Sequence, residues 1–204
     1  DLPEKPKKKR NYTKVKTVKR PPRGESIEKR PAEVDTRETF GHWEGDTVYS
    51  KKDGSKALFV LTERLTREEI MVRIKDRTAE SVIKALDRIE RKCGPVLFRK
   101  IFRTITVDNG GEFSDVDRLE RSAIRKTLKR TKVYFCHPYS SYERGSNECQ
   151  NKMIRRPFPK GTDFGNVTDA EVARAESWMN NYPRKILGWK TSEMLFRECV
   201  AALI

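Results

Sequence analysis

Histidine and closely spaced cysteine, the usual ligands of a protein zinc site, are scarce in this 204-residue sequence. It contains only two histidines, His42 and His137, and four cysteines with no Cys-x-x-Cys pair among them. This spacing indicates neither a tetrahedral zinc site nor a disulfide framework. We expect reduced, mostly buried thiols, as in a cytosolic protein.

Long apolar runs are also absent. No run approaches the ~20 residues needed to cross a bilayer, and no signal peptide is recognisable, so we expect no membrane association and a cytoplasmic location. Apolar residues make up 35% of the sequence and charged residues 37%, which predicts a modest core under a heavily charged surface. The chain begins at Asp1 without methionine, and we expect it to be a fragment that lacks an upstream region.

Positive charge is what the chain has in excess. The net charge is +15, and residues 1–30 carry 12 Lys/Arg against 4 Asp/Glu, a net of +8. A polyanion is the natural partner of such a field, because neutralised phosphates release their counterions. Residues 1–35 show no helical or strand period and predict a flexible basic arm, either a solubilising linker or an arm that tracks DNA. Its candidate DNA contacts are Lys7, Lys8, Lys9 and Arg10.

The remaining residues, 36–204, predict one folded core. Apolar periodicity and turn residues predict strands in 42–50, 57–65, 68–75, 101–108 and 132–136. They predict helices from Thr78 to Cys93 and over 115–129, 147–156, 169–181 and 192–203, with Thr168 and Glu171 as a capping box. Three strands joined by short links, followed by helical crossovers, predict an α/β fold with a mixed five-stranded sheet flanked by helices. The order fits the ribonuclease-H-like fold among others.

Three carboxylates stand out by position. Asp46 lies within the first strand, where aspartate is normally depleted, Asp108 ends the fourth, and Glu148 opens a helix. If the first and fourth strands lie side by side, Asp46 and Asp108 meet, and Glu148 reaches them from a packed helix. Asp108 before Asn109-Gly110-Gly111 also suits a simple turn. Three further glutamates lie nearby, and spacing alone does not exclude the last as the third ligand: Glu44, Glu112 and Glu143.

A cluster of this kind suits Mg²⁺, which prefers a few carboxylate oxygens together with water and phosphate. Two such ions ~3.5–4 Å apart can activate an attacking oxygen and stabilise a leaving one at phosphorus. Clustered carboxylates repel one another without metal, so we expect a two-metal site that fills only when DNA is bound.

Several longer motifs then make the sequence recognisable. In order, they are GHWEGDTV, TERLTRE, TVDNGGEF, YFCHPYSSYERGSNECQNKMIRRPFPKGTDF and NNYPRKILGWKTSEMLF. Together they resemble the insertion sequence 30 family of bacterial transposases, which belongs to the DDE superfamily alongside retroviral integrases. The resemblance covers about residues 27–197, and spaced motifs in order are far more specific than a lone carboxylate pattern.

The resemblance implies a site and an activity. The family's triad maps onto Asp46, Asp108 and Glu148, which favours Glu148 over Glu143. It implies a ribonuclease-H-like fold, Mg²⁺ or Mn²⁺ as cofactor, nicking of element ends and transfer of the 3′-hydroxyl into target DNA. It also implies a dimer or higher multimer on DNA in the bacterial nucleoid. The family usually has a helix-turn-helix region before this domain, and we expect that the chain lacks it.

Several positions depart from the family pattern. The stretch between Asp108 and Glu148 is longer, through an added basic turn around 125–130, and Cys149, Lys152 and Pro157 replace the usual residues. These changes leave the triad intact but keep an alternative open, a catalytically impaired or domesticated DNA-binding or assembly module.

Polar and basic residues recur on the helix after Glu148, on one side of it. They are Asn151, Lys152, Arg155 and Arg156. We predict that Lys152 and Arg155 grip DNA phosphates, the alternative being a solvated basic face. The three tryptophans are interpreted as core or helix-packing anchors rather than base-stacking platforms. They are Trp43, Trp178 and Trp189.

Overall fold

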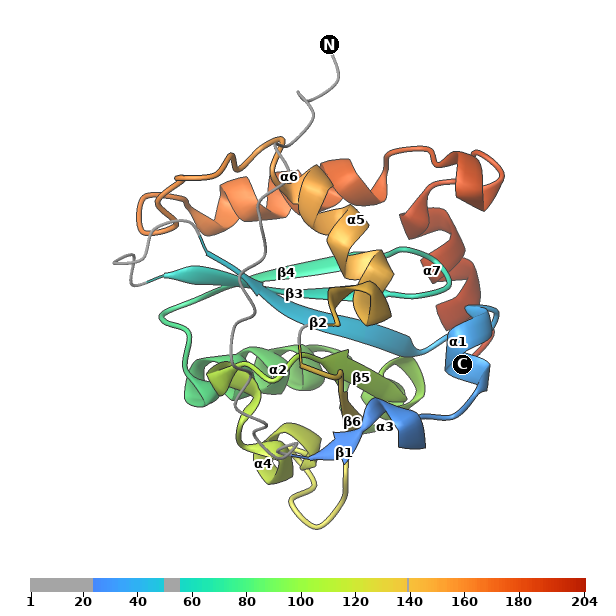
Figure 1. The fold of residues 1–204 in the computed structure, drawn as a ribbon. Helices are drawn as coiled ribbons and strands as arrows, with labels where there is room; N and C mark the ends of the chain where they lie inside the picture. The colour runs from blue at the N-terminus through green and yellow to red at the C-terminus, as the bar shows by residue number, and fades with distance from the viewer. Residues whose placement is uncertain (1–23, 50–55, 139) are drawn as a thin grey trace, which may run out of the picture.

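A mixed β-sheet between two layers of helices organises the chain (Figure 1). The computed structural model describes residues 24–49, 56–138 and 140–204, without the side chains of Ser141, Tyr142 and Glu148. The strands are β1 (Glu25–Ser26), β2 (His42–Val48), β3 (Ala57–Glu63), β4 (Glu69–Ile74), β5 (Thr104–Val107) and β6 (Lys132–Phe135). Their order in the sheet is β1-β6-β5-β2-β3-β4. The β2–β3–β4 part is antiparallel, whereas β2, β5, β6 and β1 run parallel.

Helices cover both faces of this sheet. They are α1 (Glu33–Thr36), α2 (Ala79–Cys93), α3 (Pro95–Ile101), α4 (Val116–Glu120), α5 (Gly145–Ile154), α6 (Asp169–Asn180) and α7 (Ser192–Ala201). Short 3₁₀ turns span η1 (Ile27–Lys29), η2 (Gly111–Phe113), η3 (Ser141–Arg144) and η4 (Lys185–Leu187). In Figure 1, α5 and α6 lie on one side of the sheet and α2, α3 and α4 on the other. No helix among the described residues is long and apolar enough to cross a membrane.

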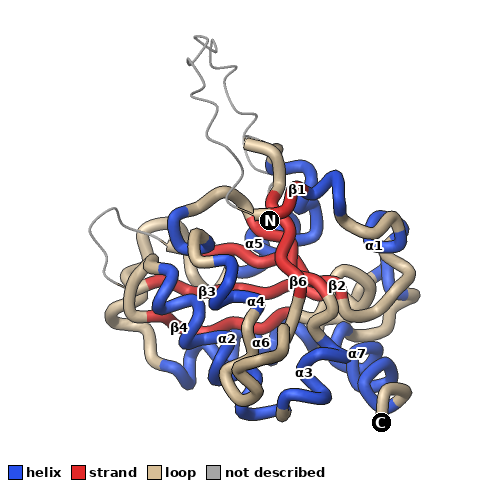
Figure 2. The backbone as a smooth tube through the Cα atoms, turned by 90° about the horizontal axis from the view of Figure 1, so that it is seen from below, coloured by secondary structure: helices blue, strands red, loops and turns tan. Residues whose placement is uncertain are grey.

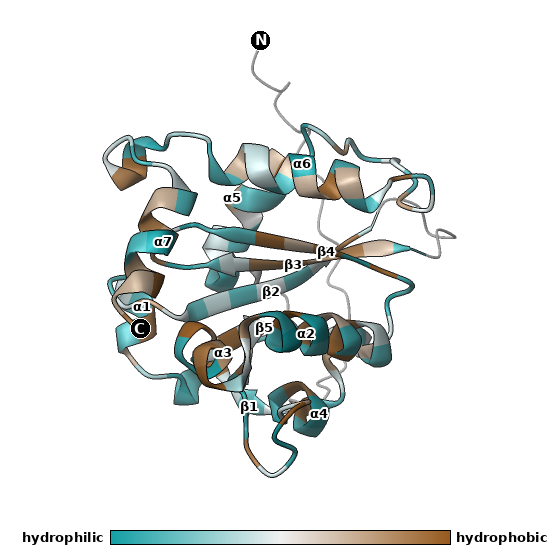
Figure 3. Cartoon of the chain, turned by 180° about the vertical axis from the view of Figure 1, so that it is seen from behind, coloured by the Kyte–Doolittle hydropathy of each residue, from teal (hydrophilic) through white to brown (hydrophobic). Residues whose placement is uncertain are grey.

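The strand alternation builds two cores. Ala57, Phe59 and Leu61 of β3 pack toward α2 and α3, while Leu58 and Val60 between them pack toward α5 and α6. A strand buried on both faces reads as a continuous apolar run because successive side chains alternate sides. Figure 3 shows hydrophobic colouring along β3 and β4 between the helical layers. The same alternation on β2 sends Trp43 to the first core and Val48 to the second, and Glu44 bonds to Asn147 of α5.

Most of the predicted elements are confirmed, including the Thr78 N-cap of α2 and the Thr168–Glu171 capping box of α6. The predicted helix over 115–129 is wrong beyond Glu120. There the chain turns back, with Ser122 N–H donating to Leu128 O at 2.9 Å and Arg130 N–H to Glu120 O at 2.6 Å. The predicted apolar stripe is too thin to hold a helix, since Ile124 and Leu128 stay exposed.

A buried ion pair between the turn and α2 holds this turn in place. The Glu90 carboxylate of α2 accepts bonds from Ser122 Oγ and Ala123 N–H, and it pairs with the fully buried Arg130. A buried carboxylate needs such partners, so the turn satisfies Glu90 at the expense of a longer helix. The sequence also missed α3. Pro95 fits the first position of a helix, where its absent N–H is not needed, and β5 accordingly begins only at Thr104.

The sheet has six strands rather than the predicted five, and the additional strand, β1, lies in the segment that was predicted to be a flexible arm. The segment from Gly24 onward is ordered: β1 pairs in parallel with β6 at the sheet edge, as Figure 2 shows. Arg30 donates to Thr106 Oγ1 at 3.0 Å, and Val34 is buried. Buried partners on β5 therefore fix residues that show no period of their own. The other arm residues, 1–23 with Lys7, Lys8, Lys9 and Arg10, lie outside the described residues.

The expectations for the tryptophans and cysteines are confirmed at some positions and wrong at others. Trp43 is a core anchor as predicted, with its Nε1 donating to Ile101 O at 2.7 Å. Trp189 is 69% exposed, so its interpretation as a packing anchor is wrong, and Trp178 is also exposed. All four cysteines are unpaired, but only Cys136 is buried, which corrects the expectation of mostly buried thiols.

Candidate active site

The sheet brings Asp46 and Asp108 to the same level on neighbouring strands. Glu44 of β2 pairs with Thr106 of β5 in the parallel register. Asp46 and Asp108 each follow that pair by two residues, so both lie on the face covered by α5. The sequence prediction that the first and fourth strands lie side by side is confirmed.

A single cation, Arg144, links the two aspartates. Its Nη2 donates to Asp108 Oδ2 at 3.0 Å, and its Nη1 lies 3.5 Å from Asp46 Oδ1 and donates to Gly45 O at 3.0 Å. Burial alone would lower the pKa of this guanidinium, but the charges of Asp46 and Asp108 outweigh it and raise that pKa. Sequence reasoning missed Arg144. The available signal was its place one helical turn before Glu148.

Asp108 sits in an environment that disfavours its charge. Burial, together with the nearby Asp46 and Glu112 carboxylates, raises its pKa, against the opposing effects of Arg144 and the Gly110 N–H. A Cβ on Gly110 would lie 2.9 Å from Asp108 Oδ1 and 2.5 Å from Glu112 Oε2. A side chain at position 110 would therefore displace one or both of these carboxylates.

Glu112, one of the three nearby glutamates, forms bonds to other residues. Its Oε1 accepts bonds from Thr47 Oγ1 at 2.5 Å and Arg77 Nη2 at 2.7 Å. Burial would raise its pKa, but these two partners lower it below the usual value. The side chain of Thr47 lies on the sheet face opposite Asp46, so Glu112 is held at the end of β2 rather than beside α5.

Helix α5 contacts the aspartates through Asn151, whose Nδ2 donates to Asp46 Oδ2 at 2.8 Å. Residue 148 lies on the same helix three positions earlier, and positions three apart share a helix face. The Glu148 side chain is outside the described ones, so its part in the site stays a prediction. Within the part of the chain that the structure describes, no three His, Cys, Asp or Glu side chains form a group that could hold a metal.

Buried polar contacts dock the first turn of α5 onto the sheet. The fully buried Glu44 accepts the Asn147 N–H at 2.8 Å through Oε2 and forms an ion pair with Arg64 through Oε1. Thr62 Oγ1 donates to Asn147 Oδ1 at 2.8 Å, and Arg67 donates to Ser146 Oγ. Glu44, one of the three nearby glutamates, thus positions the helix that carries residue 148.

Glu143, the alternative third ligand that spacing alone leaves open, bonds to His137. Its carboxylate accepts the His137 N–H at 2.8 Å and lies 2.7 Å from Nδ1. The bond from Glu143 raises the pKa of His137, assisted by Glu28. Glu143 therefore fastens the segment between β6 and α5 rather than approaching Asp46.

The predicted phosphate contacts on α5 separate into two groups. Lys152 and Arg156 are exposed, whereas Arg155 Nη2 donates to Tyr49 O at 3.0 Å just beyond the end of β2. Beside Asp46, a cleft of about 350 Å³ is lined by Thr47, Val48, Tyr49, Asn151, Arg155 and Lys160. The site thus opens onto a cleft with a basic side.

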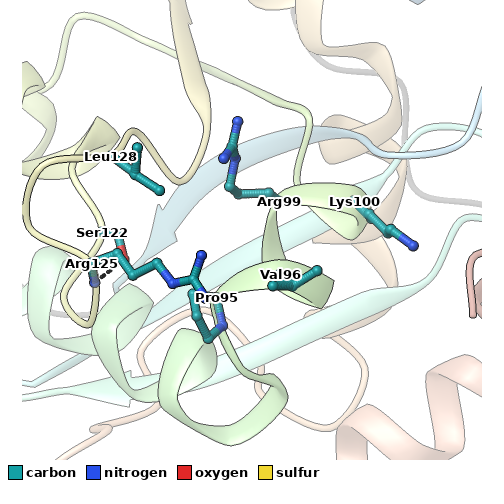
Figure 4. Close-up of a pocket in the computed structure, with 7 residues that line it drawn as sticks. All are labelled: Pro95, Val96, Arg99, Lys100, Ser122, Arg125 and Leu128. Carbon is teal, nitrogen blue, oxygen red and sulfur yellow. Dashed lines mark hydrogen bonds between the residues drawn. The ribbon is translucent and has the colours of Figure 1, made fainter.

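A second hollow lies on the other face, between α3 and the turn after α4 (Figure 4). Its volume is about 340 Å³, and it is lined by Pro95, Val96, Arg99, Lys100, Ser122, Arg125 and Leu128. Because no carboxylate lines it, this hollow offers no ligands for a metal cation.

The sheet is an antiparallel meander continued by parallel strands. One aspartate lies in the first strand of the meander, and another lies at the end of the adjacent parallel strand. This arrangement defines a ribonuclease-H-like protein. The fold is shared with a chain of the simian T-cell lymphotropic virus intasome, whose cryo-EM structure was determined in complex with PP2A regulatory subunit B56 gamma. The TM-score is 0.56 at 19% identity, covering 76% of this chain and 53% of that chain.

Sequence comparison places the chain within this class. The sequence profile described as integrase core domain matches residues 36–141, and the chain belongs to this family. It is 34% identical over 197 residues to the probable transposase for insertion-like sequence element IS1161 of Streptococcus salivarius, covering 96% of this chain and 53% of the relative. It is 35% identical over 179 residues to the transposase InsI for insertion sequence element IS30A of Escherichia coli K12, covering 87% of this chain and 43% of that relative. The resemblance to the insertion sequence 30 family is confirmed, and the chain spans about half the length of these relatives.

Proposed function

We propose that the chain is the catalytic core of a DNA transposase that nicks element ends and transfers the resulting 3′-hydroxyl into target DNA. The observation that carries the proposal is the pair Asp46–Asp108, held at one level on β2 and β5 and already bridged by a cationic group. The family membership and the transposase relatives support the substrate class.

The donor set fits a hard divalent cation. Aspartate oxygens are the ligands that Mg²⁺ and Mn²⁺ prefer, and the Arg144 guanidinium shows that the pair accepts a positive group. When bound, such ions would activate the attacking oxygen and stabilise the leaving one. We propose that Asp46 and Asp108 hold them, that Glu148 completes the set, and that Asn151 orients Asp46 through its 2.8 Å bond.

The proposed reaction needs no covalent enzyme–DNA intermediate. Water attacks a phosphodiester at the element end, and the broken bond leaves a 3′-hydroxyl. This hydroxyl then attacks a target phosphodiester, forming one new bond as one is broken and releasing a target 3′-hydroxyl. We expect a dimer or higher multimer on paired ends, acting on the bacterial nucleoid in the cytoplasm.

Metal removal tests this function directly. Supercoiled DNA carrying an element end should become nicked when incubated with the chain and Mg²⁺ or Mn²⁺, and EDTA should abolish nicking. Agarose gel separation of supercoiled and nicked circles measures the result. Binding of the DNA without nicking under any metal condition would instead favour the alternative, a DNA-binding or assembly module.

The basic residues of α5 give a second prediction. The double variant Lys152→Ala, Arg155→Ala should bind DNA of any sequence more weakly, because phosphate contacts carry no sequence information. Losing two such contacts should flatten the slope of log affinity against log salt by about 1.8. Fluorescence anisotropy across a salt series measures this slope.

The matched control for this experiment is Arg125→Ala, Lys126→Ala, which removes two exposed cations from the opposite face. It should leave the slope nearer to that of the unmodified chain. Equal flattening by both double variants would assign the effect to net charge rather than to α5.

A further inference from the structure

Arg144 occupies the place where the two aspartates converge. Its guanidinium lies 3.0 Å from Asp108 Oδ2 and 3.5 Å from Asp46 Oδ1, and its side chain is only 11% exposed. Two carboxylates this close would repel each other without a positive group between them. In this structure Arg144 is that group.

The two aspartates do not depend on Arg144 for their orientation. Asp46 Oδ2 accepts from Asn151 Nδ2 at 2.8 Å, and its Oδ1 also accepts from the Thr47 N–H at 2.8 Å. Asp108 Oδ1 accepts from the Gly110 N–H at 2.9 Å. Neutral donors therefore hold each carboxylate, and Arg144 adds charge neutralisation to a pair that is already positioned.

The pose of Arg144 is also incompletely satisfied. Its Nε is buried and has no hydrogen-bond partner among the described residues. An unpaired buried donor costs free energy, so this pose is less favourable than a fully bonded one. The residue stands at the junction of η3 and α5, where rotation of its side chain needs no change in the strands.

A divalent ion and the guanidinium compete for these carboxylates. A metal ~2.0–2.1 Å from a carboxylate oxygen would meet the guanidinium at close range, and like charges repel. We propose that Arg144 is an exchangeable counter-ion, which neutralises Asp46 and Asp108 in the metal-free protein and leaves them when a divalent cation binds. This inference rests on the proposed cation site at the two aspartates.

The exchange has a functional consequence. Metal binding without DNA must displace a favourable ion pair, so the apparent metal affinity is low. DNA supplies phosphates that can accept the released guanidinium, since arginine pairs well with phosphate. Arg144 therefore links filling of the metal site to the presence of DNA.

Metal binding to the DNA-free chain tests the exchange without any activity measurement. Arg144→Gln removes the competitor and should lower the Mn²⁺ dissociation constant, measured by isothermal titration calorimetry, by about tenfold, or roughly 1.4 kcal/mol. Arg144→Lys keeps a charge but has one nitrogen in place of the guanidinium fork, and it should lower the constant by a smaller factor. Lys160→Gln, a cation from the neighbouring cleft, should leave it within about twofold, because an exposed charge acts through screened solvent.

The outcomes separate the inference from the function on which it rests. An unchanged or higher dissociation constant in Arg144→Gln would overturn the exchange and make Arg144 a structural tie. If that variant does not fold, an unchanged constant in Arg144→Lys overturns it instead. Asp108→Asn should lose Mn²⁺ binding, and retention of full binding there would contradict the cation site itself.

Discussion

The variant Asp108→Asn is expected to lose about a thousandfold of the metal-dependent nicking rate, as does removal of other groups that stabilise a transition state. Asparagine has the same shape but replaces one charged oxygen with an amide nitrogen that cannot bind a metal, and it removes the negative charge. The fold should survive, because Asp108 is partly buried with a raised pKa and its neutral replacement relieves that cost of burial. Single-turnover nicking on element-end DNA measures the rate.

Asp46→Asn and Glu148→Gln should show losses of similar size, and the second also tests the third ligand. Glu143→Gln is the matched control, because this carboxylate lies five residues before Glu148 but bonds to His137. It should keep most of the activity. Nicking by Asp108→Asn at the rate of the unmodified chain would remove the catalytic assignment.

The second large effect is expected at Glu44, which touches neither aspartate. Glu44→Gln removes the nearer charge partner of the buried Arg64, leaving Asp35 at 4.0 Å, and weakens the bond to the Asn147 N–H. Breaking a buried ion pair costs about 3–5 kcal/mol of the free energy of unfolding. Because the first turn of α5 loses its anchor, nicking should also fall about a hundredfold, since small misplacements of a site cost about that much.

A variant of a second buried glutamate separates an effect on the stability of the fold from an effect on the position of α5. Glu90 pairs with the fully buried Arg130 on the other face of the sheet, so Glu90→Gln should lose stability to a similar degree. It should nevertheless keep its activity well below its unfolding temperature. Urea denaturation and nicking at low temperature provide the two readouts, and equal activity losses in both variants would mean that Glu44 acts only through stability.

Local patterns in the sequence determined much of the architecture. The apolar run of β3, the Thr78 cap of α2 and the Thr168–Glu171 capping box each depend on residues within a few positions of one another. Such short-range preferences can be predicted from the sequence before the fold is known. The same holds for the motifs around Asp46 and Asp108, which indicated the family before any geometry was known.

The turn after α4 has a conformation that the local sequence does not predict. Residues 121–129 have helical composition, yet the chain reverses there to satisfy Glu90, which lies 32 residues from Ser122. A buried carboxylate without partners costs more than the few tenths of a kcal/mol that separate helix propensities. Nothing within the segment itself reveals this partner.

The sequence by itself indicated Asp46 and Asp108, through their motifs, as the proposed metal ligands. Only the tertiary structure decided the roles of Arg144 and Glu44. Arg144 meets Gly45 across 99 residues of sequence, and Glu44 meets Asn147 across 103. Contacts of this kind follow from the register of β2 with β5 and from the packing of α5 against the sheet. Charge pairing acts through space, so it becomes visible only once distant strands and helices are side by side.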